Sequence, residues 1–463
     1  MATEGDEAKA SAPRARALGP YAIISIAYIL FTVTDGAIRM VILMHAYSKG
    51  FTAMEVAVMF TLYETCGAVT NVVAGVAGAR FGIRATLVSG LTLQCAGIGM
   101  LYAWSGEWER GRAIAFVTCA QALCGVAKDL TKLGGKTVTK LVTPDEKQKS
   151  LFKLVSAITG WKNSFKGVGY FLGAALLSAS YEAALSAQLG LISIALPFAI
   201  FGLDDSLGRV AKKNITLASV FRQNHNMNVL SLSRVFLFGS RDLWFEVPLP
   251  FFLRSAYGLG WSRSAVGAML AGYIIVYGQL QAWTPNLFLA PLKQDPPNKY
   301  SAVMWNFFLV VVPLYLGACV QSDIFQKHYG ATTAKIAIIV VGVFVFAFVF
   351  AVNSAIHSYL VVKYADGNKV AIDVGFYYMA NACGRLIGTL ISGVLYTYTG
   401  TIVNGFAACF WASAAFVLTS AVIELYIDDD KGGLMCGSIT CIEDAHVDPE
   451  DPSDKSFVEA GLK

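Results

Sequence analysis

The stretch GVAGARFGIR (residues 75–84) joins two apolar runs and shows how the rest of the chain is organised. The runs on either side, near 53–78 and 85–105, are each long enough for one helix to cross a bilayer. Glycines in the stretch allow a tight turn, and Arg80 and Arg84 can bind helix ends or acidic partners. The pattern predicts two consecutive membrane helices joined by a short basic loop.

The composition extends this prediction to the whole chain. Hydrophobic residues make up 56% of the 463 residues, and the mean hydropathy is +0.56, which is too apolar for a soluble protein of this length. We therefore predict an all-α polytopic membrane protein with no room for a soluble catalytic domain. Its twelve expected spans lie near 21–46, 53–78, 85–105, 112–137, 152–180, 183–203, 229–253, 262–284, 301–321, 333–362, 370–397 and 401–427.

A polar stretch divides these spans into six and six. We expect two six-helix halves with pseudo-two-fold symmetry, and Asp35 with Arg39 in one half matches Asp242 with Glu246 in the other. The tail after Ile427 is acidic, contains Pro and Gly and has few aromatic residues, which predicts disorder. The expected units are a tail at 1–20, a half at 21–203, a linker at 204–228, a half at 229–427 and a tail at 428–463.

The placement of basic residues predicts the topology. The formal net charge is only +5, but Lys and Arg collect on alternate loops, for example at 140–153 and 209–213. Because cytoplasmic loops are enriched in Lys and Arg, we expect those loops and both termini in the cytosol. The plasma membrane is the expected location.

Several cations lie inside otherwise apolar spans. Lys128, Lys132 and Lys136 recur every four residues, which places them on one stripe of a helix, and Lys162 and Lys166 form a second pair. A charge at the centre of a bilayer costs about 2.5–3.5 kcal/mol on insertion scales, so such residues usually face a wet cavity or a partner. The pattern favours an anion pathway, although Lys136 near a helix end could instead extend to lipid phosphates.

Other charged residues in the spans fit the same pathway. Arg241 and Arg385 offer guanidinium groups that bind phosphate or carboxylate with two hydrogen bonds. Asp35 and Arg39, one turn apart, could neutralise each other or take part in switching. Carboxylates able to exchange protons or to balance the cations are Glu64, Asp242, Glu246 and Asp373.

The sequence offers no sign of catalysis. It has no GxxxxGK[ST] phosphate loop and no His and Cys set with zinc spacing, and its five histidines are scattered. We expect no enzyme activity, no cofactor, no metal site and no nucleic-acid partner. Without an ATP site, transport would be secondary.

Five segments together resemble one branch of the major facilitator superfamily, the organoarsenical efflux permeases of the ArsJ type. They are FTVTDGAIRM (31–40), LYETCG (62–67), GVAKDLTKLGGKTVTK (125–140), TGWKNSFKG (159–167) and SRDLWFEVPLP (240–250), and the resemblance extends from about Tyr21 to Tyr426. The stretch at 75–84 looks like the cytoplasmic loop signature of the superfamily. It departs from that signature at Ala79, where the family usually has Asp, and this puts the gating role of the loop in doubt.

The resemblance implies a substrate and a partner. In that family, glyceraldehyde-3-phosphate dehydrogenase uses arsenate in place of phosphate, and the permease expels the resulting 1-arseno-3-phosphoglycerate, which hydrolyses outside. Such a substrate needs several cations in a polar cavity. The implied mechanism is rocker-switch alternating access at a site between the two halves, with antiport of protons, in a monomer.

Residues and resemblance together give three sets of candidates. Candidate substrate-binding residues are Arg39, Lys128, Lys132, Lys162, Lys166, Arg241 and Arg385. Candidates for proton coupling or charge balance are Asp35, Glu64, Asp129, Asp242, Glu246 and Asp373, and the candidate gating loop holds Gly75, Arg80, Gly82 and Arg84.

Two other functions fit the same residues. One is an exchanger or uniporter for ordinary organophosphates such as phosphoglycerate or sugar phosphates, which would use the same cationic cavity. The other is a transporter-like sensor or scaffold whose cytosolic tail recruits partners. The direction of transport follows from the resemblance alone.

Overall fold

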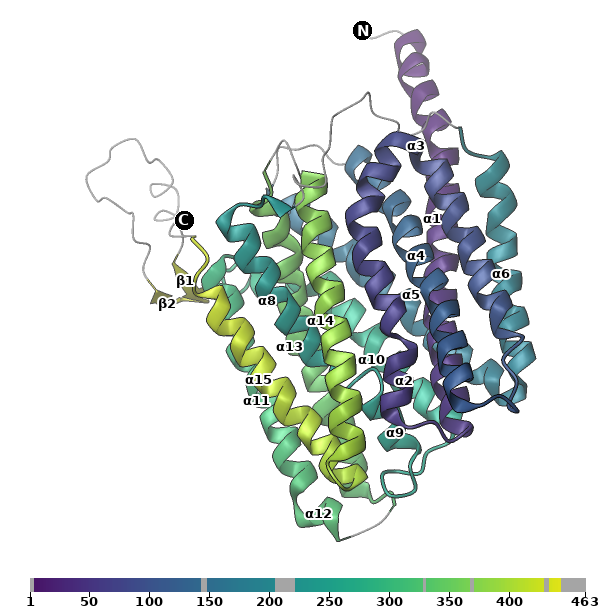
Figure 1. Ribbon diagram of the computed structural model, residues 1–463. Helices are drawn as coiled ribbons and strands as arrows, with labels where there is room; N and C mark the ends of the chain where they lie inside the picture. The colour runs from purple at the N-terminus through teal and green to yellow at the C-terminus, as the bar shows by residue number, and fades with distance from the viewer. Residues whose placement is uncertain are drawn as a thin grey trace.

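The long elements of the protein are helices that stand side by side in one bundle (Figure 1). The computed structural model describes residues 4–142, 148–204, 221–327, 330–366, 370–428 and 433–442. Within them, eight helical segments are long and apolar enough to cross a membrane. The long helices α5, α8 and α14 are not among these eight, and each of them brings charged side chains to the site described below.

The N-terminal half contains six segments that run along the bundle. Helix α1 begins at Glu4, so the described part of the predicted N-terminal tail is helical. Helix α2 leads directly into α3, and α3 itself supplies two segments. The elements are α1 (Glu4–Ser48), α2 (Ala53–Met59), α3 (Thr61–Leu101), α4 (Arg110–Val142), α5 (Gln148–Ala179) and α6 (Tyr181–Phe201).

The chain reverses direction within α3 at Gly82. This residue has φ +86° and ψ 168°, a conformation that glycine adopts at no steric cost. Before it, Tyr63 contacts Gly125 of α4, and Gly67 contacts Asp129 of α4. The second of these pairs lies four residues further along both helices than the first, so the first arm runs parallel to α4. After it, Gly90 contacts Ala127 and Gly97 contacts Ala120, so the second arm is antiparallel to α4. The predicted tight connection is therefore a single-residue corner.

The C-terminal half repeats the count of six segments, with one difference from the prediction. The expected span at 229–253 is broken, because α8 ends at Asp242 and α9 begins at Pro248 after a five-residue turn. Proline lacks a backbone N–H and begins a helix readily, which explains the break. The elements are α8 (His225–Asp242), α9 (Pro248–Arg254), α10 (Arg263–Thr284), η1 (Pro285–Leu289), α11 (Lys299–Gln321), α12 (Asp323–Gln326), α13 (Thr333–Lys363), α14 (Val370–Tyr398) and α15 (Ile402–Glu424).

The two halves meet along two seams. In one, α5 packs against α10 so closely that a Cβ on Gly160 would lie 2.2 Å from the carbonyl oxygen of Gly278. In the other, α14 packs against α2 and the first arm of α3, and Met54 N donates to Thr397 Oγ1 at 3.1 Å. Small residues bring helix backbones close together, as is common between membrane helices.

Large apolar side chains also cover much of the outer surface. Phe198, Phe201, Val311 and Val341 are each more than half exposed. Exposed apolar area of this extent marks a surface that is covered by another phase, and in a bundle of this composition that phase is the lipid bilayer.

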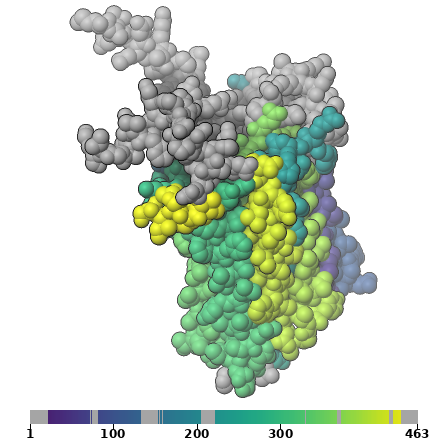
Figure 2. Space-filling model, turned by 90° about the vertical axis from the view of Figure 1, so that its left-hand side faces the viewer, coloured from purple at the N-terminus to yellow at the C-terminus, as the bar shows by residue number. Residues whose placement is uncertain are grey.

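The tail that was predicted to be disordered contains a short hairpin. Strands β1 (Leu434–Cys436) and β2 (Ile439–Ile442) pair antiparallel about Gly437, whose φ of +69° suits a tight turn. Gln294 Nε2 donates to Met435 O at 2.8 Å, which anchors the hairpin to the bundle, and Figure 2 shows it on the outer surface beside α15. The prediction of disorder is wrong for this segment, because a β-branched run after a glycine turn finds backbone partners. The Cys441 thiol donates to Cys436 Sγ at 3.0 Å and raises the pKa of the Cys436 thiol.

Candidate functional site: a charged cavity between the two halves

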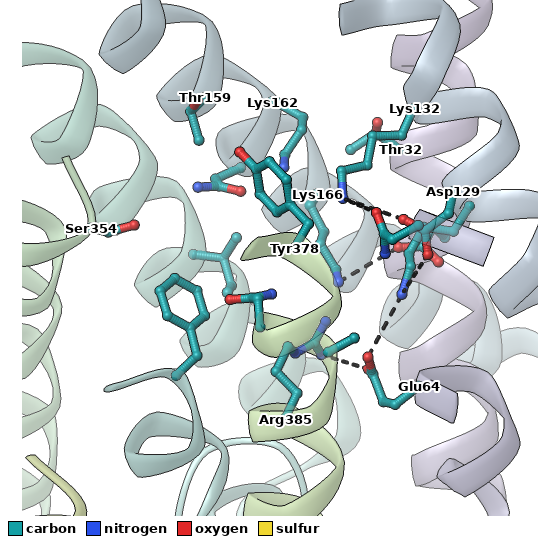
Figure 3. Close-up of a pocket in the computed structure, with 18 of the residues that line it drawn as sticks. Thr32, Glu64, Asp129, Lys132, Thr159, Lys162, Lys166, Ser354, Tyr378 and Arg385 are labelled. Carbon is teal, nitrogen blue, oxygen red and sulfur yellow. Dashed lines mark hydrogen bonds and ion pairs between the residues drawn. The ribbon is translucent and has the colours of Figure 1, made fainter. Parts of the chain in front are cut away.

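A polar cavity of about 1100 Å³, counted with the solvent space at its mouth, lies between the two halves. Helices α1, α3, α4 and α5 line it from one side, and α8, α10, α13 and α14 from the other (Figure 3). Among the described residues of its wall, seven side chains are cationic and four are carboxylates, which leaves an excess of three positive charges. They are Lys128, Lys132, Lys162, Lys166, Arg234, Arg241 and Arg385, with Asp35, Glu64, Asp129 and Glu246.

Six charged residues form an ionic cluster at the inner end of this cavity: Arg39, Glu64, Arg241, Asp242, Glu246 and Arg385. Arg39 Nη2 bonds Glu64 Oε1 at 2.8 Å, and Arg39 Nη1 bonds Glu246 Oε2 at 2.8 Å. Arg385 Nη2 reaches Glu64 Oε1 at 3.0 Å. Since Arg39 and Glu64 belong to the N-terminal half and Glu246 and Arg385 to the C-terminal half, the cluster joins the halves.

The C-terminal part of the ionic cluster is held by Arg385. Its Nε donates to Asp242 Oδ2 at 2.8 Å, and its Nη2 donates to Glu246 Oε1 at 2.8 Å. Arg241 Nη2 bonds the other oxygen of Asp242 at 2.6 Å. Three guanidinium groups thus face three carboxylates, so the cluster is neutral in formal charge.

The broken helix positions the carboxylates of the ionic cluster. Asp242 ends α8, and Glu246 lies in the turn that follows, where irregular backbone is tolerated because it is buried in protein. Trp244, fully buried, fixes this turn through ring contacts with Phe346 at 4.9 Å and Phe410 at 5.5 Å. Interrupted helices also form binding sites near the midplane of many transporters.

Of the three lysines that recur every four residues in α4, two line the cavity. Lys128 Nζ lies 3.7 Å from Glu64 and 3.8 Å from Asp129, and Lys132 Nζ lies 3.3 Å from Asp129. Each ammonium also lies over an aromatic ring, Lys128 over Tyr63 at 4.1 Å and Lys132 over Tyr378 at 4.2 Å. The side chain of Lys136 lies outside the described residues.

Asp35 and Arg39 do not pair with each other, although their spacing allowed it. Asp35 Oδ2 lies 3.5 Å from Lys166 Nζ, and Asp35 Oδ1 accepts a hydrogen bond from the Tyr63 hydroxyl. Arg39 bonds Glu64 and Glu246, as given above. Residues far apart in the sequence therefore offer better partners than the neighbouring turn.

Two cations of the cavity wall have no carboxylate partner among the described residues. Lys162 lies among other cations, with Lys132, Lys166 and Arg234 as cationic electrostatic neighbours and Asp129 as an anionic one, and Figure 3 shows it pointing from α5 into the cavity. Arg234 donates from Nε to Asn381 Oδ1 at 3.0 Å, and its buried Nη1 has no hydrogen-bond partner. Both groups are therefore available to an anion.

Arg234 was missed in the sequence, although it is a cation inside an apolar span, the same kind of signal that identified Arg385. The polar residues Asn71, Asn163, Asn381 and Tyr378 also line the cavity, and no spacing pattern marks them.

Some of the predicted residues lie elsewhere. Asp373 is buried in the first turn of α14, where its Oδ2 accepts from Asp366 N at 2.8 Å, and it does not line the cavity. Gly82 forms the corner of α3, and Arg84 follows it, partly exposed and away from the cavity wall. Gly75 lies in α3 before the corner, and the side chain of Arg80 lies outside the described residues.

Aromatic side chains join the two halves beyond the ionic cluster, at the end where α1 finishes. Tyr47 at that end of α1 packs edge-on against Phe251 of α9 at 4.9 Å, and Phe251 packs against Tyr396 of α14 at 6.2 Å. The α1 residues of the cavity wall lead from Asp35 back to Tyr28, toward the N-terminus. The cavity therefore extends from the ionic cluster toward the end of the bundle that holds the N-terminus (Figure 1).

Comparison by sequence finds no matching family model and no matching curated protein. Comparison by structure finds many similar solved chains, among them three transporters that this chain covers almost completely. The human organic anion transporter MFSD10 (TETRAN) matches with a TM-score of 0.59 and 13% identity over 87% of this chain and 98% of its own. A bacterial homologue of the iron transporter ferroportin, in an outward-facing state, matches with a TM-score of 0.62 and 15% identity over 88% and 98%. The nucleoside transporter NupG matches with a TM-score of 0.61 and 13% identity over 89% and 99%.

At these identities the likeness establishes the fold. The six segments of each half, the apolar outer surface and the three structural matches agree. They confirm the predicted fold class: the chain is an integral multi-pass membrane protein with the twelve-helix fold of the major facilitator superfamily.

Proposed function

We propose that this protein is a secondary transporter that moves a small polyanion with a phosphate-like group across the membrane by alternating access. The observation that carries this proposal is the pair of cations without carboxylate partners, Lys162 and Arg234, above a neutral ionic cluster. Burying unpaired charge is costly, so a bound anion is the expected partner of both groups.

The charge of the cavity matches such an anion. Its described wall carries an excess of three positive charges. A phosphoglycerate carries about three negative charges at neutral pH, because its carboxylate adds one to the 1.5 to 2 of a phosphate monoester. Hydroxyls and amides of Thr159, Asn163 and Asn381 also line the wall and offer hydrogen bonds to the rest of such a molecule.

Within this class we favour the organoarsenical 1-arseno-3-phosphoglycerate as substrate, exported after its synthesis by glyceraldehyde-3-phosphate dehydrogenase. The support is that charged residues from all five segments that resemble the organoarsenical permeases converge on one cavity and its ionic cluster. One charged residue from each segment, in chain order, is Asp35, Glu64, Lys128, Lys166 and Arg241. Export would proceed from the cytosol across the plasma membrane.

An ordinary organophosphate is the second candidate. Phosphate and arsenate esters present similar charge and tetrahedral shape, and the cavity wall combines guanidinium, ammonium, amide and hydroxyl groups that suit either. The human MFSD10 protein, similar in fold, is described as an organic anion transporter. Uptake of phosphoglycerate in the absence of arsenate would favour this candidate.

Inside-out vesicles distinguish the two. They receive labelled arsenate, glyceraldehyde 3-phosphate, NAD and the dehydrogenase outside, and accumulated label is measured with each component omitted in turn. A requirement for all components supports export of the arseno-ester. Equal uptake of labelled 3-phosphoglycerate without arsenate shows a general organophosphate carrier, and uptake of neither refutes the proposal.

Two variants connect this assay to the site. Lys162→Met and Arg234→Met each remove one charged hydrogen-bond partner, worth about 1.5–3 kcal/mol, so half-saturating substrate concentrations should rise roughly tenfold to a hundredfold. Lys153→Met is the matched control, because Lys153 lies on the same helix as Lys162 with an exposed side chain outside the cavity. Unchanged transport in both cavity variants would contradict the assigned site.

A further inference from the structure

A second group of polar residues lies inside the C-terminal half, separate from the cavity wall. His357 of α13 and Glu424 of α15 are both fully buried, and His357 Nε2 lies 2.7 Å from Glu424 Oε1. Ser233 Oγ donates to Glu424 Oε1 at 2.7 Å, and Asn306 Nδ2 donates to both carboxylate oxygens at 2.8 Å. The carboxylate thus receives hydrogen bonds from α8, α11 and α13.

This group is built to hold or release one proton. No lysine or arginine of the described chain forms an ion pair with Glu424, so its only cationic partner would be a protonated His357. With a neutral imidazole the pair carries one negative charge, and one added proton makes it neutral. The donors Ser233 and Asn306 stabilise the charged form, while burial stabilises the neutral form. Both protonation states therefore have a physical basis.

The pair is connected to the cavity through Tyr377. Its hydroxyl lies 3.3 Å from His357 Nδ1, and its ring centroid lies 5.0 Å from the guanidinium carbon of Arg234. Ser354 and Ser358, three residues before and one after His357, line the cavity directly. The charged and titratable groups that face the pair are Arg234 from α8, Tyr377 from α14 and, through Ser354, Tyr277 from α10, whereas α11 presents the neutral Asn306.

The pair also lies close to water. Glu424 is the last residue of α15, and the next two residues, Leu425 and Tyr426, are 52% and 68% exposed. A proton entering from this end would pass the end of one helix to reach Glu424. From there His357 and Tyr377 lead to Arg234 at the cavity wall.

We propose that His357 and Glu424 form a proton-binding site whose occupancy is linked to anion binding at Arg234. The inference rests on the proposed anion transport and assigns its coupling proton. The carboxylates of the cavity and the ionic cluster are all engaged by cations. Neutralising Glu64 or Glu246, for example, would leave Arg39 and Arg385 with fewer partners. The coupling role expected of Glu64 or Asp242 is thereby moved to this pair.

The sign of the linkage follows from charge. A negative pair attracts Arg234 and weakens its hold on an anion, whereas a neutral pair does not, so protonation strengthens anion binding. By reciprocity, anion binding favours protonation. Proton and anion then bind together, which differs from the antiport expected above. The linkage should be on the order of tenfold in affinity, as for unit charges roughly 10 Å apart at an effective dielectric constant near 20.

The test measures binding of 3-phosphoglycerate to the purified protein by calorimetry between about pH 5 and 8, the range in which histidine titrates. Between high and low pH, the affinity of wild type for the ligand should increase by about tenfold more than the affinity of Glu424→Gln does. Because the ligand's own titration is common to both proteins, it cancels in this comparison. Glu182→Gln, an exposed carboxylate on α6, is the control and should match wild type.

The outcomes separate the two proposals. Equal pH dependence in wild type and Glu424→Gln overturns the proton site, and so does the absence of proton uptake when wild type binds ligand in buffers of different ionisation enthalpy. The latter measurement needs no variant and stands even if Glu424→Gln does not fold. Failure of wild type to bind 3-phosphoglycerate or inorganic phosphate at all overturns the proposed anion transport instead. In that case an infrared pH titration of the ligand-free protein decides the proton site, which is overturned if wild type and His357→Gln titrate identically.

Discussion

Replacing Arg385 with Met should destabilise the protein much more than replacing Lys162 with Met. Arg385 makes three contacts of 2.8–3.0 Å with Asp242, Glu246 and Glu64, all of them buried. Its loss leaves these carboxylates with fewer cations, and removing one partner of a buried pair costs about 3–5 kcal/mol. Lys162 has no carboxylate partner among the described residues, so its removal relieves repulsion from neighbouring cations.

The assay is thermal unfolding of the detergent-purified variants, followed by size-exclusion chromatography of the protein that stays folded. Arg385→Met should lose stability by about 3–5 kcal/mol, and Lys162→Met should match or exceed the stability of wild type while its half-saturating substrate concentration rises as predicted above. A second substitution, Glu246→Gln, should restore part of the stability of Arg385→Met, because it removes one of the stranded charges. Arg385→Met with wild-type stability, or no coupling between the two substitutions, would refute the view that the ionic cluster is structural.

Three further predictions concern the seams and the tail. Gly278→Val should abolish transport and lower stability, since its Cβ would lie 2.4 Å from the carbonyl oxygen of Gly160, and transport with thermal unfolding measures both. Met54 N lies 3.1 Å from Thr397 Oγ1, so cysteines at these two positions should cross-link on oxidation and stop transport until a reductant is added. Truncation after Ile427 should leave transport within about twofold of wild type, because the residues of the cavity wall all precede it. Loss of export by correctly inserted truncated protein would instead support a role for the tail in recruiting partners.

The fold followed from the sequence because the bilayer imposes strong constraints on it. Apolar runs of sufficient length gave the spans, and the glycine at position 82 gave the corner between two of them. The break between α8 and α9 was missed, because an apolar run containing prolines satisfies the length rule whether or not the helix continues. Hydropathy measures whether a segment enters the membrane and says nothing of its continuity.

The candidate site was predicted in part for a related reason. Because a charged side chain is costly inside a membrane, a charge in an apolar span is a candidate site residue, and this rule identified Lys128, Lys162 and Arg385. Pairing depends on helix packing across the two halves, so the bonds of Arg39 to Glu64 and Glu246, 25 and 207 residues away, could not be read from spacing. Arg234 carried the same signal as Arg385 and could have been found.

The division between paired and unpaired charges bears on the conformational cycle of the proposed transport. Alternating access requires an occluded state, in which the cations of the cavity wall lose contact with water. The ionic cluster of Arg39, Glu64, Arg241, Asp242, Glu246 and Arg385 is neutral and meets this demand without a ligand. Lys162 and Arg234 cannot lose contact with water as readily, because an uncompensated charge in a dry interior costs several kcal/mol. A bound anion removes that cost, so on this reasoning the loaded protein changes conformation faster than the empty one, and exchange of anions exceeds their net movement.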